Sequence, residues 1–67
     1  MTRDQAIQAM DRKWRVRITH ADPVLVGDFD GIIHSIEGKR WCMVELDDRS
    51  LQGAMLKHVY RLKDLLR

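Results

Sequence analysis

A chain of 67 residues has room for one modest hydrophobic core, so we expect a single domain over residues 1–67. Hydrophobic residues make up 45% and charged residues 33%, a composition that argues against a disordered or low-complexity chain. The net charge of +2 is too small to indicate nucleic-acid binding by itself, and no apolar run approaches the roughly 20 residues that a membrane-spanning helix needs.

The cysteine content indicates a reducing compartment. Cys42 is the only cysteine, which excludes an intrachain disulfide framework and a zinc site built from several cysteines. Met1 to Asp4 do not open a signal peptide, because no apolar segment follows them. We therefore expect a cytoplasmic protein with no membrane partner.

The first predicted element is a helix over residues 2–13. Thr2 can cap its N-terminus, and Asp4 in the first turn favours the helix dipole. Ile7 and Met10 lie three residues apart and form a narrow apolar stripe. Because so short a helix is marginal alone, we expect the stripe to dock on the open end of the following β structure or on a partner. Ile7 and Met10 are therefore candidate partner-binding residues.

The chain then changes to strand-like alternation. Trp14, Val16 and Ile18 share one face of the first predicted strand, so Trp14 is interpreted as a core residue. In chain order, turn-forming residues predict strand 14–19, turn 20–23, strand 31–36, hairpin connection 37–40, strand 41–46, turn 47–50 and a weaker strand 51–56. The tail over residues 57–66 suits either a closing strand or a helix, and we expect a short strand or single-turn helix followed by a brief helical end.

Two glycines precede the second predicted strand. Gly27 and Gly31 suit a bend in a tightly curved barrel, because glycine accepts strained dihedrals and close backbone approach. Asp28 and Asp30 between them are interpreted as solvated turn residues, with Asp30 bonding to the backbone before Gly31. One helix and four or five short strands predict a mainly β fold, a small and strongly bent antiparallel barrel over residues 14–66.

This pattern resembles the KOW-type, SH3-like barrels. The residues that carry the resemblance are Val16-Arg17-Ile18, Gly27 and Gly31, Ile32-Ile33 with Ile36, Val44-Glu45-Leu46, and Leu62 with Leu65 near the end. The resemblance implies an SH3-like barrel of four to five antiparallel strands after a short N-terminal α-helix, in a family that commonly contacts RNA. Asp28 and Asp30 depart from the basic loops of members that bind ribosomal RNA, so RNA contact is expected elsewhere on the chain.

A second similarity is to the Sm and Hfq-like ring proteins. It is carried by the N-terminal helix, the strand at residues 16–18, Asp22, Gly27, the run at residues 44–47 and the late pair Lys57-His58. Pro23 stands where those proteins favour glycine, and the segment from Gly27 to His58 is longer than in the bacterial members, so this similarity ranks second. It too implies a small bent barrel that contacts RNA.

The sequence offers little catalytic chemistry. His20, His34 and His58 have no metal-ligand spacing, and Cys42 lies in an apolar strand, where a buried, inert thiol is typical. Gly27 and Gly31 lack the lysine and hydroxyl residue that complete a phosphate-binding loop. We therefore expect no catalysis, no metal and no cofactor. A small enzyme assembled from several protomers around a shared pore has no motif to support it.

Basic and aromatic residues supply the candidates for nucleic-acid binding. They are Arg15 and Arg17 on one strand face, Lys39, Arg40 and Trp41 at a hairpin, and Lys57, His58 and Arg61 near the closing strand. Cations beside an aromatic ring can hold phosphates while a base stacks on the ring. The alternative is that acidic neighbours such as Asp47 and Asp48 neutralise these cations, and we give the two interpretations equal weight.

Together these features predict a non-catalytic binding module, an adaptor that associates with RNA or DNA. The alternative is a protein–protein interaction module or accessory subunit that works as a homo-oligomer or docked on a larger complex. Its contacts would be Ile7, Met10 and Trp41, because Trp41 is expected on the outer face of its strand, where a large apolar ring often marks an interface.

Overall fold

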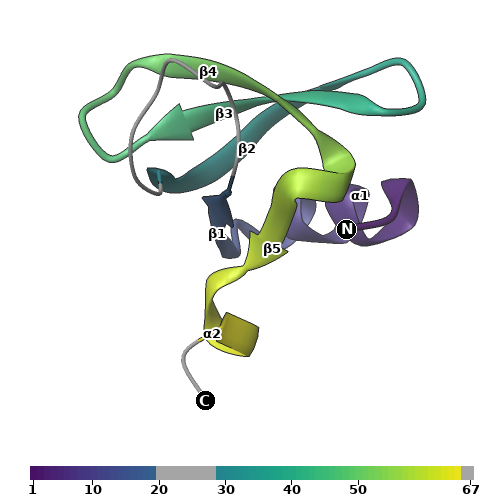
Figure 1. The fold of residues 1–67 in the computed structure, drawn as a ribbon, viewed down its shortest axis with the longest axis horizontal. Coiled ribbons are helices and arrows are strands. Elements are labelled where there is room, and N and C mark those ends of the chain that lie inside the picture. The colour runs from purple at the N-terminus through teal and green to yellow at the C-terminus, as the bar shows by residue number, and fades with distance from the viewer. Residues whose placement is uncertain (20–28, 66–67) are drawn as a thin grey trace.

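The computed structural model describes residues 1–19 and 29–65, which form one antiparallel sheet of five strands and a short N-terminal helix (Figure 1). In chain order the elements are α1 (Arg3–Arg12), β1 (Arg15–Ile18), β2 (Phe29–Glu37), β3 (Trp41–Leu46), β4 (Leu51–Met55), the 3-10 helix η1 (Leu56–His58), β5 (Val59–Arg61) and α2 (Leu62–Leu65). The predicted mainly β fold is confirmed. The ambiguous tail forms a strand followed by a short helix.

The sheet is organised around its long central strand. Its order is β4-β3-β2-β1-β5, and β2 pairs with β1 through residues 29–32 and with β3 through residues 31–37. The register of β2 against β3 shifts between Ile33 and Ser35. η1 joins β4 to β5, so the chain passes from one edge of the sheet to the other, as Figure 1 shows. This arrangement is consistent with a small β-barrel.

The predicted bend at the glycines takes a different form in the structure. Gly31 lies inside β2, opposite Val16 on one side and Leu46 on the other. A Cβ atom there would overlap the backbone oxygen of Glu45, so Gly31 is required for close backbone approach and not for a positive φ. Gly27, Asp28 and the turn predicted at residues 20–23 lie outside the described residues, as does Leu66.

Asp30 is a strand residue and not the predicted turn residue. It lies in β2 directly opposite Arg17 of β1. Its carboxylate accepts two hydrogen bonds from the guanidinium of Arg17, at 2.7 Å and 3.1 Å. The expected side-chain bond to the backbone before Gly31 is replaced by an ion pair across the two strands, because antiparallel pairing puts the two side chains on one face.

Thr2 and Gln5 cap the start of helix α1, and two alanines pack it against the core. Thr2 caps the N-terminus as predicted, since its hydroxyl accepts from the backbone N–H of Gln5 and the Gln5 side chain accepts in return from Thr2. Ala6 and Ala9 are fully buried, so the small residues form the docking face of α1, whereas Ile7 is 39% exposed. Small side chains let the helix approach the sheet closely, which leaves Ile7 outside the core.

The hydrophobic core draws on every strand. Its buried members are Ala6, Ala9, Val16, Ile18, Ile33, Cys42, Val44, Ala54, Leu56 and Val59, with Met10 and Trp14 among the half-buried residues packed against it. Trp14 is predicted to be a core residue, but in the structure it is only partly buried and packs against the core from outside. It precedes β1 in the connection from α1, where its backbone N–H donates to the oxygen of Ala9, and therefore does not follow the alternation of the strand.

We expect the substitution Gly31→Ala to lower the free energy of unfolding by about 3 kcal/mol, because the new methyl group overlaps the backbone of β3. Gly38→Ala is the matched control. Gly38 has a φ of +67° but nothing within 4 Å of the position that a Cβ atom would take, so only the left-handed backbone conformation is penalised, by about 1 kcal/mol. Urea unfolding followed by circular dichroism measures both, and equal stability of the two variants would contradict the close approach.

Candidate nucleic-acid interface

Two hydrogen bonds fix the turn between β2 and β3. Gly38 provides the positive φ that the turn requires. Nε of Arg3 in α1 donates to the backbone oxygen of Gly38 over 3.2 Å, and the N–H of Leu56 in η1 donates to the oxygen of Arg40 over 2.8 Å. The turn is therefore held against both the start of α1 and the start of η1.

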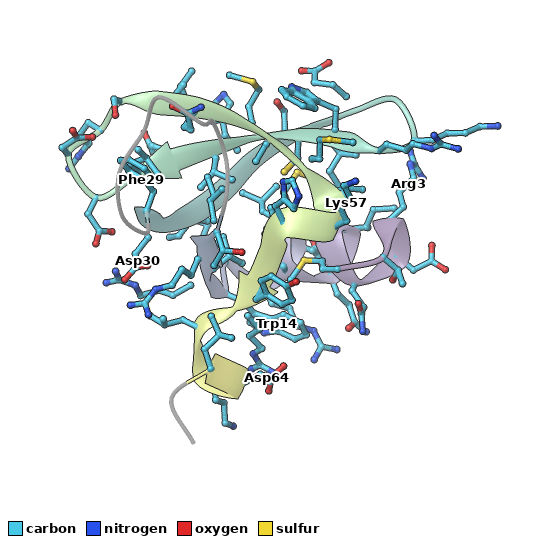
Figure 2. All side chains as sticks on the ribbon, viewed as in Figure 1. Arg3, Trp14, Phe29, Asp30, Lys57 and Asp64 are labelled. Carbon is cyan, nitrogen blue, oxygen red and sulfur yellow. The ribbon has the colours of Figure 1, made fainter. Side chains whose placement is uncertain are left out.

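This arrangement gathers four cationic side chains around one shallow depression. The depression has a volume of about 370 Å³ and is lined by Met1, Thr2, Arg3, Lys39, Arg40, Met55, Leu56 and Lys57. We call it the basic depression, after its cations Arg3, Lys39, Arg40 and Lys57. Figure 2 shows Arg3 and Lys57 on the same side of the molecule, well separated from Asp30.

The charges of the basic depression are not balanced locally. Among the described residues, no carboxylate lines it and none of its four cations forms an ion pair. Glu37, at the end of β2, accepts a hydrogen bond from the hydroxyl of Ser35 instead, over 3.1 Å. Cations without acidic partners maintain a positive potential that attracts anionic groups. The chemistry of the depression therefore suits phosphate.

Trp41 lies next to the basic depression on the outer face of β3. It follows Arg40 in the chain and pairs with Met55 across β3 and β4, and both neighbours line the depression. Trp41 is 43% exposed, as predicted for an outer-face residue. The ring edge with Nε1 and Cζ2 lies against Gly53, where a Cβ atom would be 2.9–3.0 Å from those two atoms.

Arg15 and Arg17 project from β1 as predicted, but acidic partners hold them. Arg17 makes the paired hydrogen bonds to Asp30, and Arg15 contacts Asp47 over 2.6 Å. The hydrogen bonds from Arg17 lower the pKa of Asp30 below its ordinary value, against a smaller opposing effect of burial. Arg15 and Arg17 therefore have acidic partners, as expected if neighbouring carboxylates neutralise the predicted nucleic-acid-binding cations.

The remaining predicted cations occupy a third location. The guanidinium of Arg61 in β5 lies 3.8 Å from the centre of the Trp14 ring, a cation–π contact. His58 is half-buried at the end of η1, where its backbone oxygen accepts from the N–H of Thr19 over 2.9 Å. The eight predicted residues thus do not form one surface, and only Lys39, Arg40, Trp41 and Lys57 gather at the basic depression.

Arg3 is the functional candidate that the sequence did not reveal. It stands in the first turn of α1, where nothing in the local pattern distinguishes it from a solvated helix residue. Its hydrogen bond to Gly38 spans 35 positions of the sequence. Contacts over such a distance are created by the fold and leave no signal in local periodicity.

The predicted partner residues of α1 lie on another part of the surface. Met10 is half-buried and lines a groove of about 320 Å³ together with Ile32, Ile33, Lys13, His34 and Glu45. Ile7 remains 39% exposed. The apolar stripe is therefore split, with Met10 partly committed to the core and Ile7 available at the surface.

Other chemistry finds few candidates in the described residues. Within residues 1–19 and 29–65, no group of three or more histidine, cysteine or acidic side chains could hold a metal ion. Burial raises the pKa of the Cys42 thiol to about 11, so the thiol is protonated at neutral pH. No helix in this part of the chain has the length and apolarity to cross a membrane.

No family model matches the chain, and neither the curated proteins nor the solved structures contain a significant match to it.

We expect Asp30→Asn to lower the free energy of unfolding at neutral pH by about 1 kcal/mol, since it removes the charge of a partly buried ion pair. The folded-state pKa of Asp30 is lowered, so its contribution is complete above the ordinary value of 3.8 and is lost as the pH falls through the folded pKa. Urea unfolding at about pH 7 and about pH 2 should therefore show the two proteins converging in acid. Asp47→Asn is the control and should have a smaller effect, because the Asp47 side chain is 62% exposed. A deficit of Asp30→Asn that persists unchanged at the lower pH would contradict the ion-pair explanation.

Proposed function

We propose that this chain is a non-catalytic small-barrel module that binds RNA through the basic depression. The observation that carries the proposal is the gathering of Arg3, Lys39, Arg40 and Lys57 around one depression with no carboxylate in its described lining. A phosphate placed there relieves the mutual repulsion of these cations and takes up their unused hydrogen-bond donors.

The distribution of the other basic residues supports this location. Arg15 and Arg17 each have an acidic partner among the described residues, and Arg61 lies over Trp14. A phosphate at those positions would have to compete with existing contacts. Lys39, Arg40 and Lys57 at the basic depression have no such contacts among the described residues, so an anion there would displace no existing partner.

A second candidate function is protein interaction or self-association through α1. The observations that favour it are the exposed side chain of Ile7 and, separately, the groove that Met10 and Ile32 line together with Lys13, His34 and Glu45. These residues differ from those of the basic depression, so the two functions are separable by mutation.

The RNA proposal is tested by reversing one charge at the basic depression. We expect binding of a short RNA to weaken roughly tenfold with Arg40→Glu, and the plot of log affinity against log salt to become shallower by about 0.7 or more. For the unmodified chain the four cations predict a slope of about −3, at about −0.7 per phosphate contact on a single strand. Fluorescence anisotropy at several salt concentrations measures both quantities.

Lys63→Glu is the matched control for this experiment. It makes the same change in net charge on α2, and Lys63 does not line the basic depression. We expect little change in affinity. Equal losses for Arg40→Glu and Lys63→Glu would show a response to net charge only, and unchanged binding by Arg40→Glu would remove the basic depression as the site.

The second candidate is tested by placing a charge on the exposed helix residue. If copies of the chain associate through α1, sedimentation velocity should show a concentration-dependent increase in mass that Ile7→Lys abolishes, while stability changes by no more than about 0.5 kcal/mol. An unmodified chain that stays monomeric at high concentration would exclude self-association.

A further inference from the structure

Trp41 combines three properties that none of its neighbours has together. It is a large aromatic residue with 43% of its surface exposed, it adjoins the basic depression through Arg40 and Met55, and it lies on the outer face of the sheet. Its contact with Gly53 uses the ring edge with Nε1 and Cζ2. An edge contact does not consume the faces of the indole, which are the surfaces on which a planar group stacks.

The ring of Trp41 adjoins residues that line the basic depression. Directly paired residues in an antiparallel sheet have Cα atoms about 4.5–5.5 Å apart. Trp41 is paired in this way with Met55, which lines the basic depression. A phosphate in the depression and a planar group on Trp41 can therefore belong to the same or adjacent nucleotides.

From this juxtaposition we infer that the ligand is a single-stranded nucleic acid, with one base stacked on Trp41 and the adjoining phosphates in the basic depression. The inference rests on the proposed function and specifies its substrate class. Every base has a face that can stack, so the contact selects for an unpaired strand without selecting a sequence. A duplex offers its phosphates, but its bases are stacked on one another and cost a few kcal/mol to expose.

Two apolar neighbours of Trp41 support a stacking role. Met43 and Met55 flank it on the outer face of β3 and β4, and both are half-buried. Its directly paired neighbour in β2 is Glu37, whose carboxylate accepts a hydrogen bond from Ser35. None of the described carboxylates forms an ion pair with Arg40 or Lys39 beside the ring. A base that stacks on the ring therefore leaves water beside two methionines and has the cations Lys39 and Arg40 near it.

The experiment compares binding of a single-stranded RNA, the corresponding single-stranded DNA and an RNA duplex of equal length. We expect Trp41→Ala to weaken binding of both single strands roughly five- to hundredfold, as measured for single stacking contacts elsewhere, and to change duplex binding less than about twofold. The salt dependence should stay as it was, because no phosphate contact is lost. Trp41→Phe keeps an aromatic ring and should recover most of the affinity.

Two further variants separate the ring from its surroundings. Leu51→Ala removes an exposed apolar side chain from the same face and should leave binding unchanged. Gly53→Ala alters no charge and removes no ring atom, but its methyl group would come within 2.9–3.2 Å of the indole and displace it. It should weaken single-strand binding in the same direction as Trp41→Ala. Circular dichroism and urea unfolding verify that each variant is folded.

Tryptophan fluorescence supplies a readout that does not depend on affinity. Trp14 and Trp41 are the two tryptophans of the chain. Saturating single-stranded RNA should quench the emission of the unmodified protein, and Trp41→Phe, which retains Trp14, should abolish that quenching. Quenching that persists in Trp41→Phe would overturn the assignment of the stacked base to Trp41.

The outcomes distinguish this inference from the function on which it rests. If Trp41→Ala binds single strands normally while Arg40→Glu is impaired, the stacking inference is wrong and RNA binding at the basic depression stands. If single strands and duplex weaken equally on loss of Trp41, the selection for unpaired strands is wrong. If the unmodified chain binds none of the three nucleic acids, both fail, and the exposed ring belongs to a protein interface.

Discussion

The curvature of the sheet requires β2 to approach β3 closely at Gly31. Gly31 belongs to both ladders of the central strand, facing Val16 of β1 and Leu46 of β3. A side chain there would overlap the backbone of Glu45. Because β2 can approach β3 this closely, one short sheet curves around a single core, and η1 can connect its two edge strands.

That curvature also creates the basic depression. η1 lies against the turn between β2 and β3, and α1 begins at the same place, so Arg40, Arg3 and Lys57 come together from three separate elements. The hydrogen bonds that fix the turn are made by backbone groups of Gly38 and Arg40, which leaves the side chains of Lys39 and Arg40 available. Structural support and surface charge are thus supplied by different atoms of the same turn.

The described ion pairs explain how a chain with a small net charge can carry a locally positive surface. Asp30 and Asp47 hold Arg17 and Arg15, and Figure 2 shows Asp30 well apart from Arg3 and Lys57. Asp30 and Asp47 therefore neutralise cations of β1 and none of the four cations of the basic depression. A chain that is almost neutral overall can present one locally positive surface, and it is this local imbalance, with Trp41 at its border, on which the proposal of single-strand binding depends.

Local sequence patterns were enough to predict the mainly β fold, the Thr2 cap, the third strand at residues 41–46, the buried thiol of Cys42 and the exposure of Trp41. Each of these follows from alternation or local hydrogen bonding, which act over a few residues. Tertiary structure alone decided that Gly31 serves a backbone contact, that Asp30 pairs with Arg17, and that Arg3 joins Lys39, Arg40 and Lys57. These features depend on which strands become neighbours and on how far the sheet curves, and local patterns of hydrophobicity and charge do not encode either.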